Sequence, residues 1–297
     1  MELDFNYSSV ASLTAAALRS GLPISVLVLK QQAQQMELPE EHIYEQMRKN
    51  YQVMADCIEP GCKQDLRSTS GLTGGSAYKM RQISESGKSL TGSFLSGALY
   101  RALAVSELNA AMGRIVAAPT AGSSGIVPGL LLALQEEYSI PDSRVIDALF
   151  NAGAIGYLAM RNATVAGAVG GCQAEVGVAS AMAASAAVEL MGGTAKQCLN
   201  AASSVLMNLL GLVCDPLGGL VECPCQGRNA AGAAVALTAA ELALSGIRQL
   251  IPFDEMLAAM YRVGRQLSPD LRETALGGCA ATPTGKALGC RACPCSP

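Results

Sequence analysis

Residues 174–191 read AEVGVASAMAASAAVELM, and this stretch decides the fold class. Alanine has the highest helix propensity of the amino acids, whereas the β-branched residues that favour strands are few in it. The only charged side chains are Glu175 and Glu189, so almost the whole surface of such a helix is small and uncharged. That surface is typical of a buried helix that packs closely against other helices.

The segments on both sides of this stretch have the same character. Ala and Leu dominate them, and alternation of apolar with polar residues occurs only over short lengths. We predict further helices over residues 12–35, 39–59, 93–114, 125–138, 142–161, 194–211, 229–247 and 252–267. No linker and no repeat of fixed period divides the chain. The predicted fold class is therefore mainly α, a single large all-helical domain over residues 1–297, with a mobile tail from about residue 287.

Composition and charge exclude several classes of protein. Hydrophobic residues make up 50% of the 297 residues and charged residues 15%, so the chain can build a core and is not disordered. The net charge is −3 and the Lys and Arg residues are scattered, which argues against a nucleic-acid partner. The longest uncharged stretches, 115–135 and 197–214, are interrupted by prolines or polar residues, so we expect no membrane span.

The chain has one histidine, His42, and 11 cysteines. Ser-His-Asp triads, Cys-His dyads and HExxH zinc sites all need a well-placed imidazole, so most hydrolase chemistry is excluded. His42 shares no motif, and we expect it to lie at the surface. The odd number of cysteines, behind an N-terminus without an apolar signal core, favours reduced thiols in a cytoplasmic protein.

Two segments combine cysteines with glycine-rich sequence. GAVGGCQAEVG surrounds Cys172, and CDPLGGLVECPCQGRNA carries Cys214, Cys223 and Cys225. Thiolates without histidine are the ligands of iron-sulfur clusters, and cysteines distant in sequence can converge on one cluster. Buried free cysteines are also common as small apolar residues. The residues alone therefore leave a cluster and ordinary packing equally open.

Several segments together resemble the α subunit of the bacterial iron-sulfur-dependent L-serine dehydratases. They are SGLTGGSAYK (70–79), AAPTAGSSGIVPG (117–129), GGCQAEVGVASAMAA (170–184), CDPLGGLVECPCQGRNA (214–230) and ATPTGK (281–286), and they occur in the family's order. The resemblance implies elimination of water from L-serine to give pyruvate and ammonia. It also implies a [4Fe-4S] cluster bound through the matching positions, which are Cys172, Cys214 and Cys225.

Three protein ligands leave one iron of such a cluster open to substrate, as in catalytic metal sites that keep an exchangeable position. That iron is expected to act as a Lewis acid on the β-hydroxyl while a base removes the α proton. These segments contain no histidine, so Lys79, Lys286 or a hydroxyl such as that of Ser124 is the candidate base. A buried lysine can serve because burial lowers its pKa. The sequence does not choose among these residues.

The substrate carboxylate needs hydrogen-bond donors of its own. Ser123 and Ser124 precede an apolar helical run, so their hydroxyls and the following N–H groups can hold an anion at a helix N-terminus. The SGLTGG loop offers a second such site, and two polar residues follow the third cluster cysteine. The predicted substrate-binding residues are Ser70, Thr73, Gly74, Gly75, Ser123, Ser124, Arg228 and Asn229.

The chain departs from the family pattern at Ser76, where an acidic residue is expected, and at Cys223 and Cys279, where aliphatic residues are expected. We expect Cys223 not to bind the cluster, since only one of two such close thiols readily reaches a given iron. We expect Cys279 to pack in the core. For Cys290, Cys293 and Cys295 in the tail, a metal site, a frayed reduced end and reversible shielding of the open iron all stay open.

Other functions stay open beside dehydration of L-serine. One alternative is a related β-eliminating lyase whose substrate is L-cysteine or L-threonine. An active site discriminates only modestly against one added methyl group or a sulfur in place of oxygen. Another alternative is a non-catalytic iron-sulfur redox protein, in which protein ligands would bind every iron of the cluster. The sequence shows no small α/β domain of the kind that single-chain family members carry, so the resemblance also implies a separate β subunit and an oligomeric enzyme.

Overall fold

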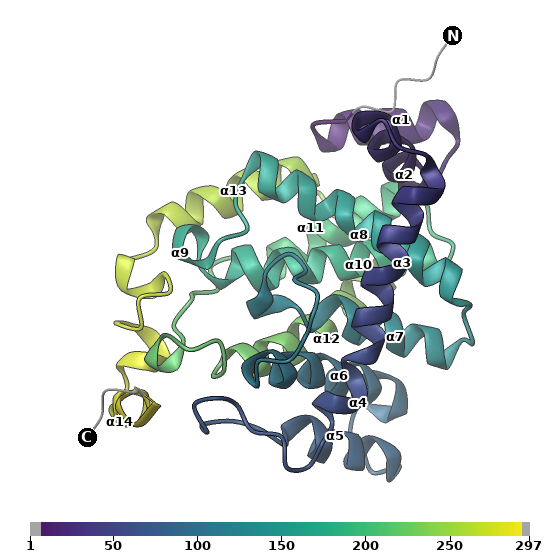
Figure 1. The fold of residues 1–297 in the computed structure, drawn as a ribbon. Coiled ribbons are helices and arrows are strands. Elements are labelled where there is room, and N and C mark those ends of the chain that lie inside the picture. The colour runs from purple at the N-terminus through teal and green to yellow at the C-terminus, as the bar shows by residue number, and fades with distance from the viewer. Residues whose placement is uncertain (1–6, 293–297) are drawn as a thin grey trace.

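The structure, a computed structural model, describes residues 7–292 as α-helices joined by turns and loops (Figure 1). This range contains no strand, and its one isolated bridge joins Cys214 and Arg272. The prediction of a single, mainly α domain is confirmed. The α-helices are α1 (Val10–Ser20), α2 (Ile24–Met36), α3 (Glu40–Asp56), α4 (Ile58–Gly61), α5 (Ser76–Glu85), α6 (Gly92–Ala110), α7 (Ile126–Glu137), α8 (Asp142–Asn162), α9 (Gly167–Gly170), α10 (Val178–Leu190), α11 (Ala195–Leu209), α12 (Cys225–Leu244), α13 (Phe253–Gln266) and α14 (Pro283–Ala292).

Helix α10 lies at the centre of the fold and packs against α7, α8, α11 and α12 (Figure 1). Every residue of α10 except Glu189 is buried. Its small side chains let the neighbouring helices approach closely. A Cβ atom added at Gly156 of α8 would lie only 3.0 Å from the sulfur of Met182 in α10. The alanine-rich stretch that predicts the fold class therefore forms most of the centre of the core.

The N-terminal helices differ from the prediction. The helix predicted over residues 12–35 is two helices, α1 and α2, because Gly21 adopts a left-handed conformation (φ 67°) and Pro23 follows it. The axes of these two helices are bent by 102°. The helix predicted over residues 39–59 ends at Asp56, and the short α4 follows it.

Helix α5 is missing from the prediction. Its first turn is capped by Glu107 of α6, whose buried carboxylate accepts the N–H groups of Ser76 (2.8 Å) and Ala77 (3.1 Å). A negative charge at this position stabilises a helix N-terminus. Glu107 lies 31 residues beyond Ser76 in the chain, so no local sequence pattern reveals this cap.

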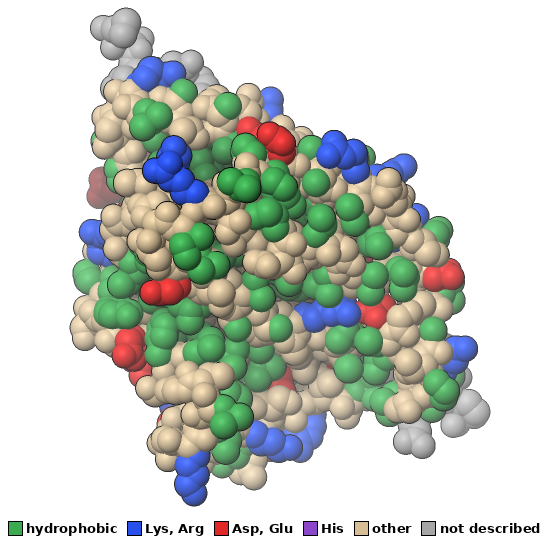
Figure 2. All heavy atoms as spheres, turned by 180° about the vertical axis from the view of Figure 1, so that it is seen from behind, with side chains coloured by type: hydrophobic (Ala, Val, Ile, Leu, Met, Phe, Trp, Pro, Cys, Tyr) green, Lys and Arg blue, Asp and Glu red, His purple; other side chains and the backbone are tan. Residues whose placement is uncertain are grey.

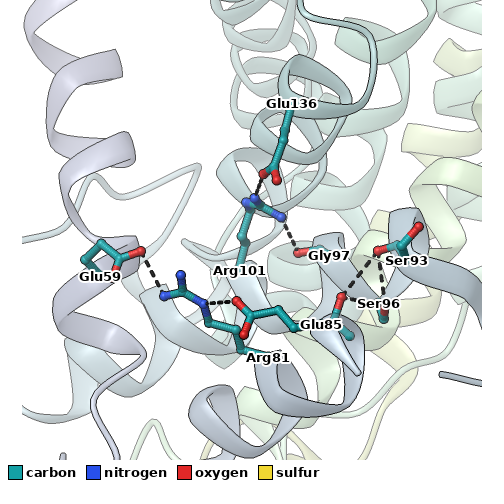
Figure 3. Close-up of polar contacts among 9 residues, drawn as sticks. Glu59, Arg81, Glu85, Ser93, Ser96, Gly97, Arg101 and Glu136 are labelled. Atoms are coloured by element: carbon teal, nitrogen blue, oxygen red, sulfur yellow. Dashed lines mark hydrogen bonds and ion pairs between the residues drawn. The ribbon is translucent and has the colours of Figure 1, made fainter. Parts of the chain in front are cut away.

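A smaller apolar cluster joins α4, α5 and α6 beside the main core. It contains Cys57, Ile58, Cys62, Ala77, Tyr100, Ala104 and Val105. Figure 3 shows the ion pairs around it: Arg81 of α5 pairs with Glu59 (2.8 Å) and Glu85 (2.7 Å). Arg101 of α6 pairs with Glu136 of α7 (Figure 3). The loops that follow α4 and α6 therefore start from helices that are tied to their neighbours.

The surface carries no single charged region on the face that Figure 2 shows, where Lys and Arg side chains lie scattered among apolar ones. His42 is exposed, as predicted, and its ring lies 3.4 Å from the Gln46 amide nitrogen. Within residues 7–292, each helix taken alone is too short or too polar to cross a bilayer, and α1 and α2 meet that criterion only as a bent pair.

The C-terminal helix α14 packs against a short 3₁₀ turn, η3 (Leu217–Gly219). The contact is made by backbone: a Cβ atom added at Gly218 would lie 3.1 Å from the Cα atom of Gly289. Residues 287–292 of the predicted mobile tail belong to this helix. Cys290 is exposed on it, whereas Cys293 and Cys295 lie outside the described residues.

Candidate metal centre

Cys172 stands at the start of a π-helical turn, η2 (Gln173–Gly177), that leads into α10. Gln173 fixes this turn to the segment before Cys214, because its N–H donates to the Leu212 carbonyl (2.9 Å) and its side-chain oxygen accepts the Gly211 N–H (2.8 Å). Single π turns of this kind often occur at functional sites. The turn therefore brings two of the predicted cluster cysteines together.

Cys172 and Cys214 face each other in the buried interior, with Glu175 of the π turn beside them. The ligand atoms of these three residues all lie within 4.8 Å of one another, so they are able to hold a metal ion. The Cys214 thiol lies 3.7 Å from Glu175 Oε2. A hydrogen bond from Cys214 lowers the pKa of the Cys172 thiol, whereas the same contact and burial raise the pKa of Cys214.

Cys225 is the first residue of α12 and is buried next to this pair. Burial, together with the negative charges of Cys172 and Glu175, raises the pKa of its thiol to about 12. The structure therefore pairs Cys172 with Cys214 and buries Cys225 close enough for the charge of Cys172 to act on its thiol. Cys225 itself falls outside the 4.8 Å group that the other two form with Glu175.

Arg228 supplies the positive charge at this site. Its guanidinium donates to the Val213 carbonyl (2.8 Å), pairs with Asp215 (2.8 Å) and contacts the Cys172 thiol. Burial acts to raise the pKa of Asp215, but the Cys279 N–H and Arg228 outweigh it and lower that pKa. The predicted role of Arg228 is substrate binding, and the contacts that the structure gives it are with the loop of the cysteines.

The AGSSG loop packs on the same site. Thr120 donates to Glu175 Oε1 (3.0 Å), and the side chain of Asn229 accepts the Gly125 N–H (2.9 Å) and donates to the Gly122 carbonyl (2.7 Å). These two bonds join the loop to α12, and Asn229 is fully buried.

Ser123 and Ser124 are also fully buried. The Ser124 hydroxyl donates to the Ala121 carbonyl (2.8 Å), and the Ser123 hydroxyl contacts that of Thr120 (3.1 Å). Their roles in substrate binding stay predictions.

The SGLTGG loop reaches the site through one carboxylate. Ser70 and Thr73 both donate to Glu222, which lies between Cys214 and Cys225 in the chain. Gly74 has φ 142°, and a Cβ atom there would lie 2.1 Å from the Leu66 carbonyl oxygen, so only glycine fits. The structure therefore joins the loop of the predicted substrate residues to the loop of the predicted cluster residues.

The two lysines predicted as candidate bases lie at the surface. Lys79 on α5 and Lys286 on α14 are both exposed, and their roles as base stay predictions. Cys223 is exposed. The expectation that Cys279 packs in the core is wrong: its side chain is exposed, and the residue is anchored to the interior by a polar contact, the bond from its backbone N–H to the buried Asp215 (2.6 Å), rather than by apolar packing.

Sequence reasoning missed Glu175 and Glu222. Glu175 is the only charged residue in GAVGGCQAEVG, and Glu222 stands three residues before Cys225. An acidic side chain inside an apolar cysteine segment needs a partner when the segment is buried. That signal was available, but the sequence does not show which partner each carboxylate finds.

The fold and the site together define a class: an all-helical protein with a candidate metal centre of two buried cysteines and a carboxylate, next to a third buried cysteine. The sequence model of the family described as serine dehydratase alpha chain matches residues 19–280, and the chain belongs to this family. The resemblance stated from the sequence is therefore confirmed.

Relatives of two lengths are similar to this chain. A probable L-serine dehydratase alpha chain of Bacillus subtilis is 46% identical over 282 residues, covering 95% of this chain and 94% of the relative. The L-serine dehydratase alpha chain of Peptoniphilus asaccharolyticus is 44% identical, covering 90% and 92%. The L-serine dehydratase of Streptomyces coelicolor is 36% identical over 94% of this chain, which spans only 61% of that longer protein.

Proposed function

We propose that this chain is the cluster-bearing α subunit of an enzyme that eliminates water from L-serine to give pyruvate and ammonia. The observation that supports the proposal is the buried pair Cys172 and Cys214, with the buried Cys225 within reach of the charge of Cys172, in a chain of this family. Three thiols without a histidine are a donor set that suits an iron-sulfur cluster and does not suit a hard cation such as Mg²⁺ or Ca²⁺.

The proposed cofactor is a [4Fe-4S] cluster held by these three cysteines. When bound, it supplies an iron without a protein ligand that acts as a Lewis acid and eases departure of the β-hydroxyl. The residues present fit the group in charge as well as in type. Arg228 contacts the Cys172 thiol and so offsets part of the negative charge that three thiolates bring into a buried site.

The protein residues around the cysteines orient and enclose the reaction. Asn229 fixes the AGSSG loop against α12, and Thr120 holds the Glu175 carboxylate next to Cys214. For removal of the α proton we keep the predicted candidates, Lys79, Lys286 and the Ser124 hydroxyl. Exchange of the α hydrogen of L-serine with deuterated solvent, measured on the alanine variant of each, distinguishes them, because loss of the base abolishes this exchange.

We further propose that the active enzyme is an oligomer that contains a separate β subunit. Relatives of this length are named alpha chains, whereas the Streptomyces coelicolor protein carries additional sequence in the same chain. The exposed thiols of Cys223 and Cys279 suit a reducing compartment such as the cytoplasm.

Anaerobic purification followed by iron and sulfide analysis tests the proposal. We expect about four irons and four sulfides per chain, and pyruvate formation from L-serine that increases when the candidate β subunit is added. Air should inactivate the enzyme, and iron with a reductant should restore it, because the iron without a protein ligand is the most exposed.

The same preparation separates the alternatives. A higher kcat/KM with L-cysteine or L-threonine than with L-serine would reassign the substrate. A cluster that cycles reversibly between two oxidation states, with a visible spectrum that L-serine leaves unchanged, would make the chain a redox protein instead. Activity that survives iron chelation undiminished would contradict the role of the cluster.

A further inference from the structure

Glu222 is a buried carboxylate between the two loops of the site, and its side chain is 5% exposed. Its Oε1 accepts a hydrogen bond from the Ser70 hydroxyl and its Oε2 accepts one from the Thr73 hydroxyl, each at 2.7 Å. Hydrogen bonds of this length to an ionised acceptor are among the stronger ones in proteins. Both oxygens of the carboxylate are therefore used by the SGLTGG loop.

These contacts occupy the two hydroxyls that the sequence predicts to bind substrate. A hydroxyl has one proton, and both protons here are given to Glu222. Each hydroxyl oxygen also accepts a further bond: Leu72 N–H donates to Ser70 (3.0 Å), and Gln226 donates to Thr73 (2.9 Å). Neither hydroxyl is free to donate to a substrate carboxylate while Glu222 is in place.

The backbone N–H groups of the loop are differently placed. Those of Gly74 and Gly75 have no hydrogen-bond partner among the described residues, whereas the N–H of Thr73 donates to Ser68. Successive backbone N–H groups without a protein partner can bind an anion, and Gly74 and Gly75 offer two such groups in a row. The loop therefore retains donors for a carboxylate, and they belong to its backbone.

Glu222 also sets where these donors lie relative to the cysteines. Its own N–H donates to the Leu220 carbonyl (2.7 Å), and its carbonyl accepts the N–H of Gln226 (2.9 Å), the residue after Cys225. A shift of Glu222 therefore moves the loop of Ser70 and Thr73 relative to the start of α12. The contact is a direct link between the two halves of the site.

We propose that Glu222 is a positioning residue: it binds the hydroxyls of Ser70 and Thr73 so that backbone N–H groups of Gly74 and Gly75, rather than those hydroxyls, receive the substrate carboxylate beside the cysteines. This inference rests on the proposed function, and it names the part of the site that recognises the carboxylate.

The test uses the anaerobically reconstituted enzyme with its β subunit and the variant Glu222→Gln, which keeps the shape of the side chain. An amide accepts one hydroxyl but can no longer accept both, so the loop loses one of its two anchors. We expect KM for L-serine to rise at least tenfold with kcat changed less than threefold. Iron per chain and the visible absorption should stay at the values of the unmodified enzyme.

Two further variants make the role of Glu222 specific. Thr73→Val removes the same contact from the other side, so the double variant should be no worse than the more affected single variant. Glu189→Gln is the matched control, because Glu189 also accepts several hydrogen bonds but lies at the far end of α10. We expect its KM for L-serine to be unchanged.

A second measurement separates this inference from the proposed function. Calorimetric titration with L-alanine, which has the ammonium and carboxylate groups of L-serine but no leaving group, should show at least tenfold weaker binding in Glu222→Gln. If the unmodified enzyme forms no pyruvate but shows this difference, the dehydratase proposal fails and the positioning role stands. Unchanged KM and L-alanine affinity, or loss of iron in Glu222→Gln, would overturn the positioning role.

Discussion

Two acidic side chains flank the central helix: Glu175 lies in the π turn that precedes α10, and Glu189 lies in the last turn of α10. Their hydrogen-bond partners differ. At the C-terminal end, Glu189 accepts the N–H groups of Ile24 (2.9 Å) and Ser25 (3.2 Å) and the amide of Asn151 (2.7 Å). In the turn before α10, Glu175 accepts one hydroxyl and otherwise faces a thiol. Because its oxygens accept N–H donors from α2 and α8, Glu189 joins these helices to α10. Glu175 contacts one hydroxyl and one thiol in this way, and it belongs to the candidate metal centre.

The same contrast applies to the cysteines at the two ends. Cys198 of α11 is fully buried and interacts with Asn151 and Ser185 in the network around Glu189, and burial raises the pKa of its thiol. Cys172 is almost as deeply buried, but its pKa is lowered by Cys214. Two thiols with nearly the same burial therefore have pKa values shifted in opposite directions, because the groups beside them differ.

The largest expected effect comes from removing cysteines. Each of Cys172→Ala, Cys214→Ala and Cys225→Ala should abolish both the visible absorption and pyruvate formation, because a cluster with two remaining protein ligands is not retained. Cys198→Ala is the matched control and should keep both. Full iron content and turnover in any of the three variants would show that the ligand assignment is wrong.

The next largest effect is expected on stability, when the Glu189 carboxylate is removed. Glu189→Ala leaves the first N–H groups of α2 and the Asn151 amide without an acceptor, which should lower the free energy of unfolding by about 3 kcal/mol. Denaturant unfolding of the cluster-free chain measures this loss. Iron per chain after reconstitution should be unchanged. A fall in iron content at unchanged stability would show that Glu189 supports the metal centre and not the helix packing.

A smaller effect is expected at Ser124, in the loop beside Glu175. Its fully buried hydroxyl donates to the Ala121 carbonyl, so Ser124→Ala should lower the free energy of unfolding by about 1 kcal/mol. We expect KM for L-serine to stay within twofold. A tenfold or larger rise in KM at unchanged stability would instead place the substrate carboxylate at Ser124, as the sequence predicts.

The smallest effect is expected at Glu175, where the substitution should raise the free energy of unfolding instead of lowering it. Burial raises the pKa of Glu175 in the folded chain, so ionisation of this group costs stability as the pH rises through that pKa. Glu175→Gln should therefore make the cluster-free chain slightly more stable at pH 7. The difference in melting temperature should vanish by about pH 3, well below the ordinary glutamate pKa of about 4.3, because the Glu175 side chain is then neutral in both the folded and the unfolded chain. A variant that is less stable at pH 7 would contradict this.

The sequence predicted most of the helices because their apolar pattern is local. Residues 142–161, 194–211 and 252–267 match α8, α11 and α13 to within a few residues. The division of residues 12–35 into α1 and α2 has a local cause, Gly21 and Pro23, whereas the missing helix α5 depends on a distant residue. Helix α5 begins where Glu107 caps it, and no pattern within the segment shows a partner on the next helix.

The sequence indicates the cysteines of the candidate site but not the contacts that support them. The three cysteines stand in recognisable motifs, and the structure buries all three. The roles of Glu175 and Glu222 depend on which hydroxyls and thiols lie opposite them, and those residues come from loops more than 30 positions away. The pattern predicts that Cys279 packs because aliphatic residues occupy its position in the family, but its side chain is exposed and only its backbone N–H reaches the buried Asp215.

The contact of α14 with the turn at Leu217–Gly219 has a practical consequence for handling the protein. Helices α1 and α14 lie at opposite ends of the molecule (Figure 1). Of these two helices, α14 packs against η3, which precedes Cys225 in the chain. The close backbone approach of Gly218 and Gly289 leaves no space there for bulky additions. An affinity tag, a fluorescent fusion or an immobilisation handle therefore belongs ahead of α1, where it is remote from the cysteines.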